Sequence, residues 1–97
     1  MIIVSGKIEV SPLYRMELLS IIEPYVRAAR KAFGNLRFHI SEDCDHSGNF
    51  YVYEEWDAVT ARGLHMRTET ARYFRRMLKA MHVLAIELNQ YEVSKVI

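Results

Sequence analysis

Two short stretches of alternating polarity constrain the fold more than any other part of this sequence. Residues 34–40 and 50–56 are rich in aromatic and β-branched residues, and a run of turn-forming residues, 43–49, separates them. This pattern predicts an antiparallel hairpin. Successive side chains of a strand point to opposite faces, so one face of the hairpin must be buried. The apolar face comprises Leu36, Phe38, Ile40, Phe50, Val52 and Trp56.

The opposite face of the hairpin is amphipathic. It carries Arg37, His39, Ser41, Tyr51, Tyr53 and Glu55. Tyrosines beside charges expose much aromatic area, so we expect a second partner on this face. A symmetric copy would bury the tyrosine rings and pair the charges. The sequence therefore predicts an obligate homodimer whose two sheets pack face to face.

The segment before the hairpin predicts a strand and a helix. Residues 2–10 alternate with one apolar face, which is typical of a strand. Ser11 is a suitable N-cap, Pro12 suits the first helical position, and Gly34 suits the position after the helix. The predicted helix buries a stripe at helical spacing, formed by Leu18, Leu19, Ile22, Val26, Ala29 and Phe33.

The segment after the hairpin predicts further helix and a last strand. Asp57 is the expected cap of a helical region that runs to about Met81, with a break where Thr68 offers a new N-cap. Residues 84–96 alternate as a strand, with a bulge expected before Tyr91. The latter half of the helical region carries the inward residues Ala71, Phe74, Leu78 and Met81 and the opposite basic residues Arg72, Arg75, Arg76 and Lys79.

A length of 97 residues predicts a single domain over residues 1–97, and the order of its expected elements is β-α-β-β-α-β. It is an α+β, ferredoxin-like fold, with an antiparallel sheet and both helical regions on one face. The basic residues are expected to form a solvated helix face, with a phosphate or carboxylate site as the alternative reading.

Charge and cysteine content exclude several classes of partner. Lys and Arg number 13 against 12 Asp and Glu, so a net charge of +1 gives no reason to expect nucleic acid or an anionic membrane. No apolar run approaches the length of a membrane span, and no signal peptide is evident. The single cysteine, Cys44, cannot form an internal disulfide, which favours a cytoplasmic protein.

One pattern of residues extends from the hairpin into the helical region that follows it. It comprises Gly34, Leu36, Phe38, the run 50–56, Ala61, His65, Thr68 and Phe74. This pattern resembles the antibiotic-biosynthesis monooxygenase (ABM) family, which implies a dimeric α+β barrel. Members of that family include quinol and anthrone monooxygenases, haem-degrading enzymes and phospho-autoinducer isomerases. The hairpin is most similar to the isomerases and the quinol monooxygenases.

Departures from the family pattern narrow the expected chemistry. Haem-degrading members carry a tryptophan where this chain has His65 and a histidine near the position of Arg75. Haem degradation is therefore not expected. Anthrone-oxidising members have an asparagine and a tyrosine where this chain has Val52 and Arg62, whereas Trp56 and Arg76 match their pocket residues.

The resemblance implies a cofactor-independent monooxygenase that oxidises a small electron-rich aromatic, such as a quinol or anthrone, with molecular oxygen. His65 is the candidate catalytic base, because a histidine titrates near neutral pH, although a core histidine is the alternative. Trp56 either walls the pocket or only packs in the core. The candidate substrate-binding residues are Trp56, Phe38, Val52, Arg62, Phe74 and Arg76.

No cofactor or metal is expected. The sequence has no glycine-rich phosphate loop, no Cys-x-x-Cys motif and no dinucleotide fingerprint. Residues 43–46 include types that bind metals, but in a hairpin loop they favour turn chemistry.

Alternative functions remain open. One is an isomerase or lyase acting on a small phosphorylated sugar-like ligand, in which His65 moves the proton and Arg62 or Arg76 holds the anion. Another is a ligand-binding dimer without catalysis.

Overall fold

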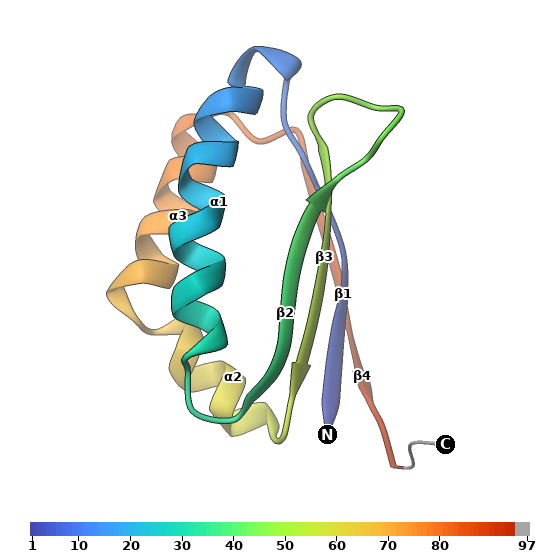
Figure 1. Ribbon diagram of the computed structural model, residues 1–97, viewed down its shortest axis with the longest axis vertical. Helices are drawn as coiled ribbons and strands as arrows, with labels where there is room; N and C mark the ends of the chain where they lie inside the picture. The colour runs from blue at the N-terminus through green and yellow to red at the C-terminus, as the bar shows by residue number, and fades with distance from the viewer. Residues whose placement is uncertain (95–97) are drawn as a thin grey trace.

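The computed structural model describes residues 1–94. Its elements are β1 (Ile2–Glu9), a short 3-10 helix η1 (Pro12–Tyr14), α1 (Arg15–Arg30), β2 (Asn35–Glu42), β3 (Asn49–Trp56), α2 (Val59–Met66), α3 (Glu69–Ala80) and β4 (Ala85–Glu92). This order confirms the predicted ferredoxin-like fold, with the second helical region divided into α2 and α3 (Figure 1). No helix within residues 1–94 is long and apolar enough to cross a membrane.

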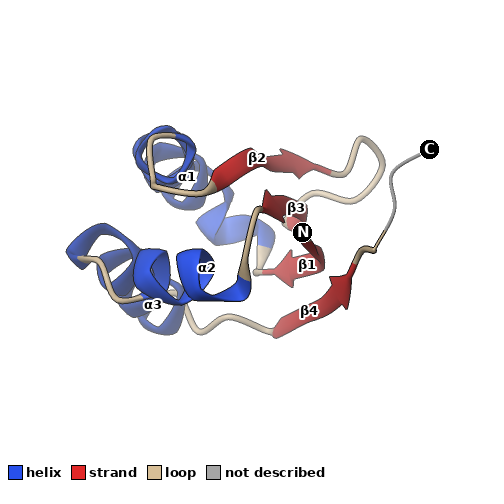
Figure 2. Ribbon diagram, turned by 90° about the horizontal axis from the view of Figure 1, so that it is seen from below, coloured by secondary structure: helices blue, strands red, loops and turns tan. Residues whose placement is uncertain are grey.

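The four strands form one antiparallel sheet in the order β2-β3-β1-β4. The helices lie together on one side of this sheet, and β4 lies at its edge (Figure 2). Ile86 and Leu88 of β4 remain partly exposed. The helix layer therefore covers the central strands more fully than the β4 edge.

The predicted alternation of the hairpin is confirmed for Phe38, Phe50, Val52 and Trp56, which are all buried. Leu36 is different, because its side chain is 53% exposed. The pairing of β2 with β3 shifts register between Asn35 and Arg37, so Leu36 is the extra residue of a bulge. The prediction that Leu36 lies on the buried face was wrong for this reason.

The first helix begins near its predicted position and ends early. The Ser11 hydroxyl accepts a hydrogen bond from the Leu13 amide, but it caps η1, which continues into α1. Because α1 ends at Arg30, Phe33 lies in the following loop and is 84% exposed, not buried as predicted. Gly34 has a φ of 81°, a conformation that favours glycine, so it forms the turn into β2.

The boundary between α2 and α3 confirms the predicted break. The Thr68 hydroxyl accepts a hydrogen bond from the Ala71 amide at 3.2 Å and so caps α3. Asp57 does not cap α2, because Ala58 occupies that position. The Asp57 amide instead donates to the carbonyl of Gly34 at 2.9 Å, which joins the loop before β2 to the end of β3.

The last strand is shorter and more regular than predicted. β4 ends at Glu92, and its pairing with β1 runs in one register from Glu92 to Ala85, so the bulge expected before Tyr91 was wrong. Val96, the predicted end of the strand, lies outside the described residues.

The position of Trp56 yields a test of the fold. Trp56 is fully buried and contacts Phe38, so we expect Trp56→Ala to lower the free energy of unfolding by about 3–5 kcal/mol in urea denaturation. Phe33→Ala removes an exposed aromatic ring and serves as the control, with an expected change below about 0.5 kcal/mol. Equal effects of the two substitutions would contradict this assignment of the core.

Candidate active site

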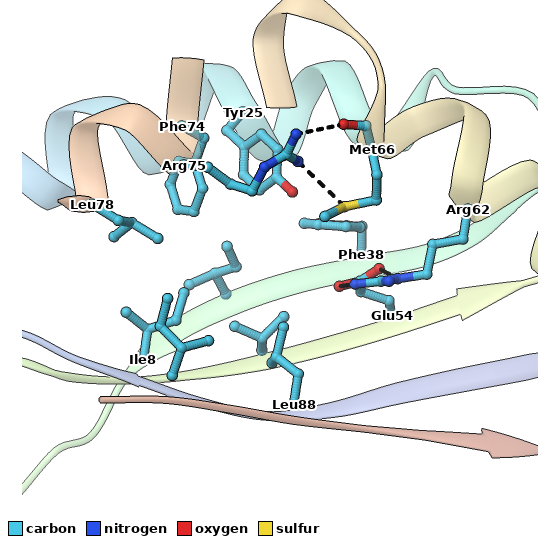
Figure 3. Close-up of a pocket in the computed structure, with 13 residues that line it drawn as sticks. Ile8, Tyr25, Phe38, Glu54, Arg62, Met66, Phe74, Arg75, Leu78 and Leu88 are labelled. Carbon is cyan, nitrogen blue, oxygen red and sulfur yellow. Dashed lines mark hydrogen bonds and ion pairs between the residues drawn. The ribbon is translucent and has the colours of Figure 1, made fainter. Parts of the chain in front are cut away.

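A cavity of about 90 Å³ lies between the helix layer and the inner face of the sheet (Figure 3). Its walls are mainly apolar and are formed by Ile8, Phe38, Ile40, Val52, Met66, Phe74, Leu78, Ile86 and Leu88. Its hydrogen-bonding side chains are Tyr25, Glu54, Arg62 and Arg75. An apolar cavity with a few convergent polar groups is the usual form of a small-molecule site.

Tyr25 is the polar group that α1 places in this cavity. Its ring stacks on Phe74 of α3 at 4.1 Å between centroids and meets the edge of Phe38 at 5.5 Å. Its hydroxyl oxygen lies 3.2 Å from Nε2 of His65, to which the O–H donates when Nε2 is unprotonated. Burial, followed by the charge of Glu54, raises the pKa of Tyr25 to about 12. Tyr25 is therefore a protonated phenol at neutral pH.

His65 belongs to α2 and contacts Tyr25, but it does not line the cavity itself. Its side chain is only 4% exposed. Its ring lies 5.1 Å from that of Trp56 and 5.6 Å from that of Phe38, and its carbonyl accepts a hydrogen bond from the Thr68 hydroxyl. Burial lowers the pKa of His65, an effect that Glu54 opposes and that Arg62 and Arg75 strengthen. The ring is thus neutral near pH 7 and can accept a proton at Nε2.

Glu54 is a buried carboxylate on the face of β3 that also carries Val52 and Trp56. Its Oε1 accepts hydrogen bonds from Nε1 of Trp56 at 2.8 Å and from Nε of Arg62 at 2.9 Å. Oε2 accepts a further bond from Nη2 of Arg62 at 3.4 Å. Both oxygens therefore have partners, and the charge of Glu54 is balanced by Arg62.

Arg75 of α3 also lines the cavity. Its Nη2 donates to the carbonyl oxygen of Met66 at 2.8 Å, and its Nη1 lies 3.8 Å from the sulfur of the same residue (Figure 3). Arg76, the next residue, instead forms an ion pair with Glu69 at 3.3 Å and lies over the ring of Tyr73. Arg76 is not among the cavity-lining residues.

The structure brings most of the predicted site residues together. Phe38, Val52, Arg62 and Phe74 line the cavity. Trp56 and His65 do not line the cavity, but each contacts residues that do. Arg76, which was predicted to bind the substrate, does not line the cavity. Arg75, the preceding residue, does.

Sequence reasoning missed Tyr25 and Glu54. It named Arg75 only among the basic residues of α3, for which a phosphate or carboxylate site was the alternative reading. Tyr25 follows Ile22 by three residues and precedes Ala29 by four, so helical spacing places it on the buried stripe. Glu54 lies between two apolar residues of the same strand face, and a carboxylate at such a position needs a partner. These signals were present in the sequence for Tyr25 and Glu54.

The hairpin loop brings Asp43, Cys44 and Asp45 close together, with potential ligand atoms within 4.8 Å of one another. Asp43 accepts hydrogen bonds from the Tyr51 hydroxyl at 2.7 Å and from the Asp45 amide at 2.8 Å. The bond from Tyr51 is the main reason that the pKa of Asp43 is lowered. These contacts are those expected of turn residues.

The Tyr25–His65 pair predicts how stability depends on pH. Because the pKa of His65 is below 6.5, the unfolded chain binds a proton there that the folded chain does not, and stability falls as the pH drops below about 6.5. Because the pKa of Tyr25 is about 12, the unfolded chain loses its proton first, and stability falls as the pH rises above 10.

Urea unfolding between pH 5 and 11 measures both slopes. We expect His65→Gln to reduce the acid slope and Tyr25→Phe to reduce the alkaline slope. His46→Gln and Tyr73→Phe, at exposed positions, are the matched controls. Unchanged slopes in the site variants would contradict the burial of this pair.

The chain is similar to a known family and to several solved structures. A family model described as antibiotic biosynthesis monooxygenase (ABM) matches residues 1–77. A structure from Deinococcus radiodurans, provisionally named an antibiotic biosynthesis monooxygenase, is 26% identical, with a TM-score of 0.92 over 100% of this chain and 96% of its own. A Nitrosomonas europaea structure with the same provisional name is 16% identical, with a TM-score of 0.90 over 98% of this chain and 100% of its own.

A Pseudomonas aeruginosa structure is 23% identical, with a TM-score of 0.86 over 96% of this chain and 94% of its own. The Nitrosomonas and Pseudomonas structures are 16% and 23% identical to this chain, and at such low identity their similarity shows a shared fold alone. No curated protein gives a significant match.

Proposed function

Because the chain belongs to the antibiotic biosynthesis monooxygenase family, we propose that it oxidises a small electron-rich aromatic compound with molecular oxygen and without a bound cofactor. The observation that supports this most directly is the Tyr25 hydroxyl, which lines an apolar cavity and is hydrogen-bonded to His65. Such a site can remove a proton from a substrate that binds against its apolar walls.

The proton step runs through Tyr25. A substrate hydroxyl near the Tyr25 oxygen gives up its proton to that oxygen as Tyr25 passes its own proton to Nε2 of His65. His65 is then the base, although it does not line the cavity itself. The raised pKa of Tyr25 suits this role, because the phenol keeps a proton throughout and can donate a hydrogen bond to the substrate anion.

The oxygen step uses electrons from the substrate alone. The deprotonated ring transfers one electron to oxygen, and the two radicals combine to form a carbon–oxygen bond at a carbon that carries hydrogen. The resulting hydroperoxide loses water and leaves a carbonyl group. One oxygen atom enters the product, the other leaves as water, and the substrate supplies the two hydrogens. The apolar walls favour this route because they reduce the contact of the reactive intermediates with solvent.

The lining favours an aromatic ring over the phosphorylated sugar of the alternative function. A sugar needs a hydrogen-bond partner for each hydroxyl that enters an apolar site. The oxygens of Glu54 are already bonded to Trp56 and Arg62, so they are not free to accept hydrogen bonds from sugar hydroxyls. Apolar walls contributed by Val52, Phe74 and their neighbours suit a flat ring.

Oxygen uptake by purified, metal-stripped protein on a panel of quinols tests the reaction. We expect uptake by the wild type and a loss of about 10²–10⁴-fold in kcat for Tyr25→Phe and for His65→Gln, because each breaks the proton path. Tyr25→Phe retains the ring that stacks on Phe74, so it separates the hydroxyl from packing. Tyr73→Phe on the exposed part of α3 is the control.

Wild-type protein that consumes no oxygen with any member of the panel would refute the reaction. Full activity in both Tyr25→Phe and His65→Gln would refute the proton path alone.

We also propose that the protein is a homodimer joined through the open face of its sheet. Tyr51 and Tyr91 are about half exposed on this face, beside Glu55 and Lys7, as ladder register and alternation place them. A symmetric partner would bury the rings and pair the charges. An interface of this kind exceeds about 2,000 Å² in obligate dimers.

Sedimentation equilibrium at sub-micromolar concentration tests the dimer, and we expect twice the mass of one chain. Tyr53→Asp places a charge at the centre of the face and should reduce both assembly and folding, whereas Tyr73→Asp on α3 should affect neither. A folded and active monomer would contradict the proposal.

We also propose a cytoplasmic location, which the chemistry of the single cysteine supports. Cys44 is exposed and has no intramolecular disulfide partner. An exposed free thiol persists best in a reducing compartment. We therefore expect the protein to act in the cytoplasm.

A further inference from the structure

The charges around the cavity do not cancel. Glu54 and Arg62 form an ion pair at 2.9 Å, so together they contribute no net charge. Arg75 contacts a carbonyl oxygen and a thioether sulfur, and within residues 1–94 it has no carboxylate partner. One positive charge at the cavity is therefore left without a partner of opposite sign.

We propose that the substrate is a single-ring aromatic acid whose carboxylate binds to Arg75 while its ring enters the apolar cavity beside Tyr25. This inference rests on the proposed function and specifies its substrate class. The basic residues of α3 were expected to form a solvated face, with a phosphate or carboxylate site as the alternative. Arg75 is exposed like the others, but it is the member that also lines the cavity.

Arg75 is suited to bind a carboxylate. A guanidinium group has five N–H donors in a planar fork that matches the two oxygens of a carboxylate. The 2.8 Å bond from Nη2 to the Met66 carbonyl uses one strong donor and fixes the side chain at the cavity. The remaining donors are available to a ligand, and a side chain that is already positioned loses less entropy on binding.

The size of the cavity and the single charge define the ligand further. A volume of about 90 Å³ holds several water molecules, which suits one ring with small substituents better than a fused three-ring system. A carboxylate carries one negative charge and so balances the one unpaired arginine. A phosphate monoester carries close to two and would leave an excess negative charge near Glu54.

A carboxylate at this position would also act on the proton path. The charge of Arg75 lowers the pKa of both His65 and Tyr25. A bound carboxylate neutralises this charge, so it raises the pKa of His65 and makes that residue a stronger base. The base is then strengthened when an acidic substrate occupies the cavity.

Binding of ligands that cannot be oxidised tests the substrate class separately from the reaction. Benzoate, its neutral analogue benzamide, and phenyl phosphate are titrated into the wild-type protein at low salt, with affinity measured by calorimetry. We expect benzoate to bind about tenfold more tightly than benzamide, as a charge-assisted bond provides. Nuclear magnetic resonance of the His65 ring should show its pKa rise on addition of benzoate and not of benzamide.

Matched variants of α3 assign the effect to one residue. Arg75→Gln should remove the preference for benzoate and the rise in the pKa of His65, and Arg75→Lys should restore part of the preference. Arg72→Gln removes an exposed charge of the same helix and should leave both unchanged.

Each other outcome overturns the inference. Equal affinity for benzoate and benzamide, or no binding of either, refutes the acid-binding role of Arg75. Tighter binding of phenyl phosphate than of benzoate assigns the site to a phosphorylated ligand. Because no probe is a quinol, these results hold whether or not the protein consumes oxygen.

Discussion

The burial of Glu54 is the constraint on which the rest of the site depends. A carboxylate inside an apolar face of a sheet is strongly destabilising unless it is paired and hydrogen-bonded. Arg62 of α2 and the indole N–H of Trp56 provide those partners. The ion pair therefore turns one face of α2 toward β3. His65 and Met66 follow Arg62 by three and four residues, so the same face carries them toward the cavity.

Much of the fold follows from local patterns in the sequence. Alternation defined the buried residues of β3, and the Thr68 cap marked the break between α2 and α3. Leu36 and Phe33 were misplaced because a bulge and an early helix end each shift a residue out of the pattern, and neither has a strong local signal. Such irregularities depend on how the helices pack on the sheet, which periodicity does not report.

The site was harder to predict than the fold, because it forms where distant segments meet. His65 and Trp56 were found through family resemblance, but the partner of His65 is Tyr25, which is 40 positions away in sequence. Arg75 and Arg76 are adjacent, and successive residues of a helix point about 100° apart. A motif spacing that is uncertain by one residue cannot decide between them. Only the packing of α3 shows that Arg75 lines the cavity.

The two faces of the sheet allow assembly and chemistry to be separate. Gly6 pairs with both Val52 and Leu88, which are two residues of the cavity wall. A Cβ atom at Gly6 would lie 1.7 Å from the carbonyl oxygen of Glu87, so the close approach of β1 and β4 requires glycine. By alternation Ile86 and Leu88 face the cavity, whereas Glu87 and Tyr91 point to the open face. A partner on that open face would hold β4 in place without filling the cavity. The proposed dimer and the proposed substrate site would thus use opposite faces of the same strand.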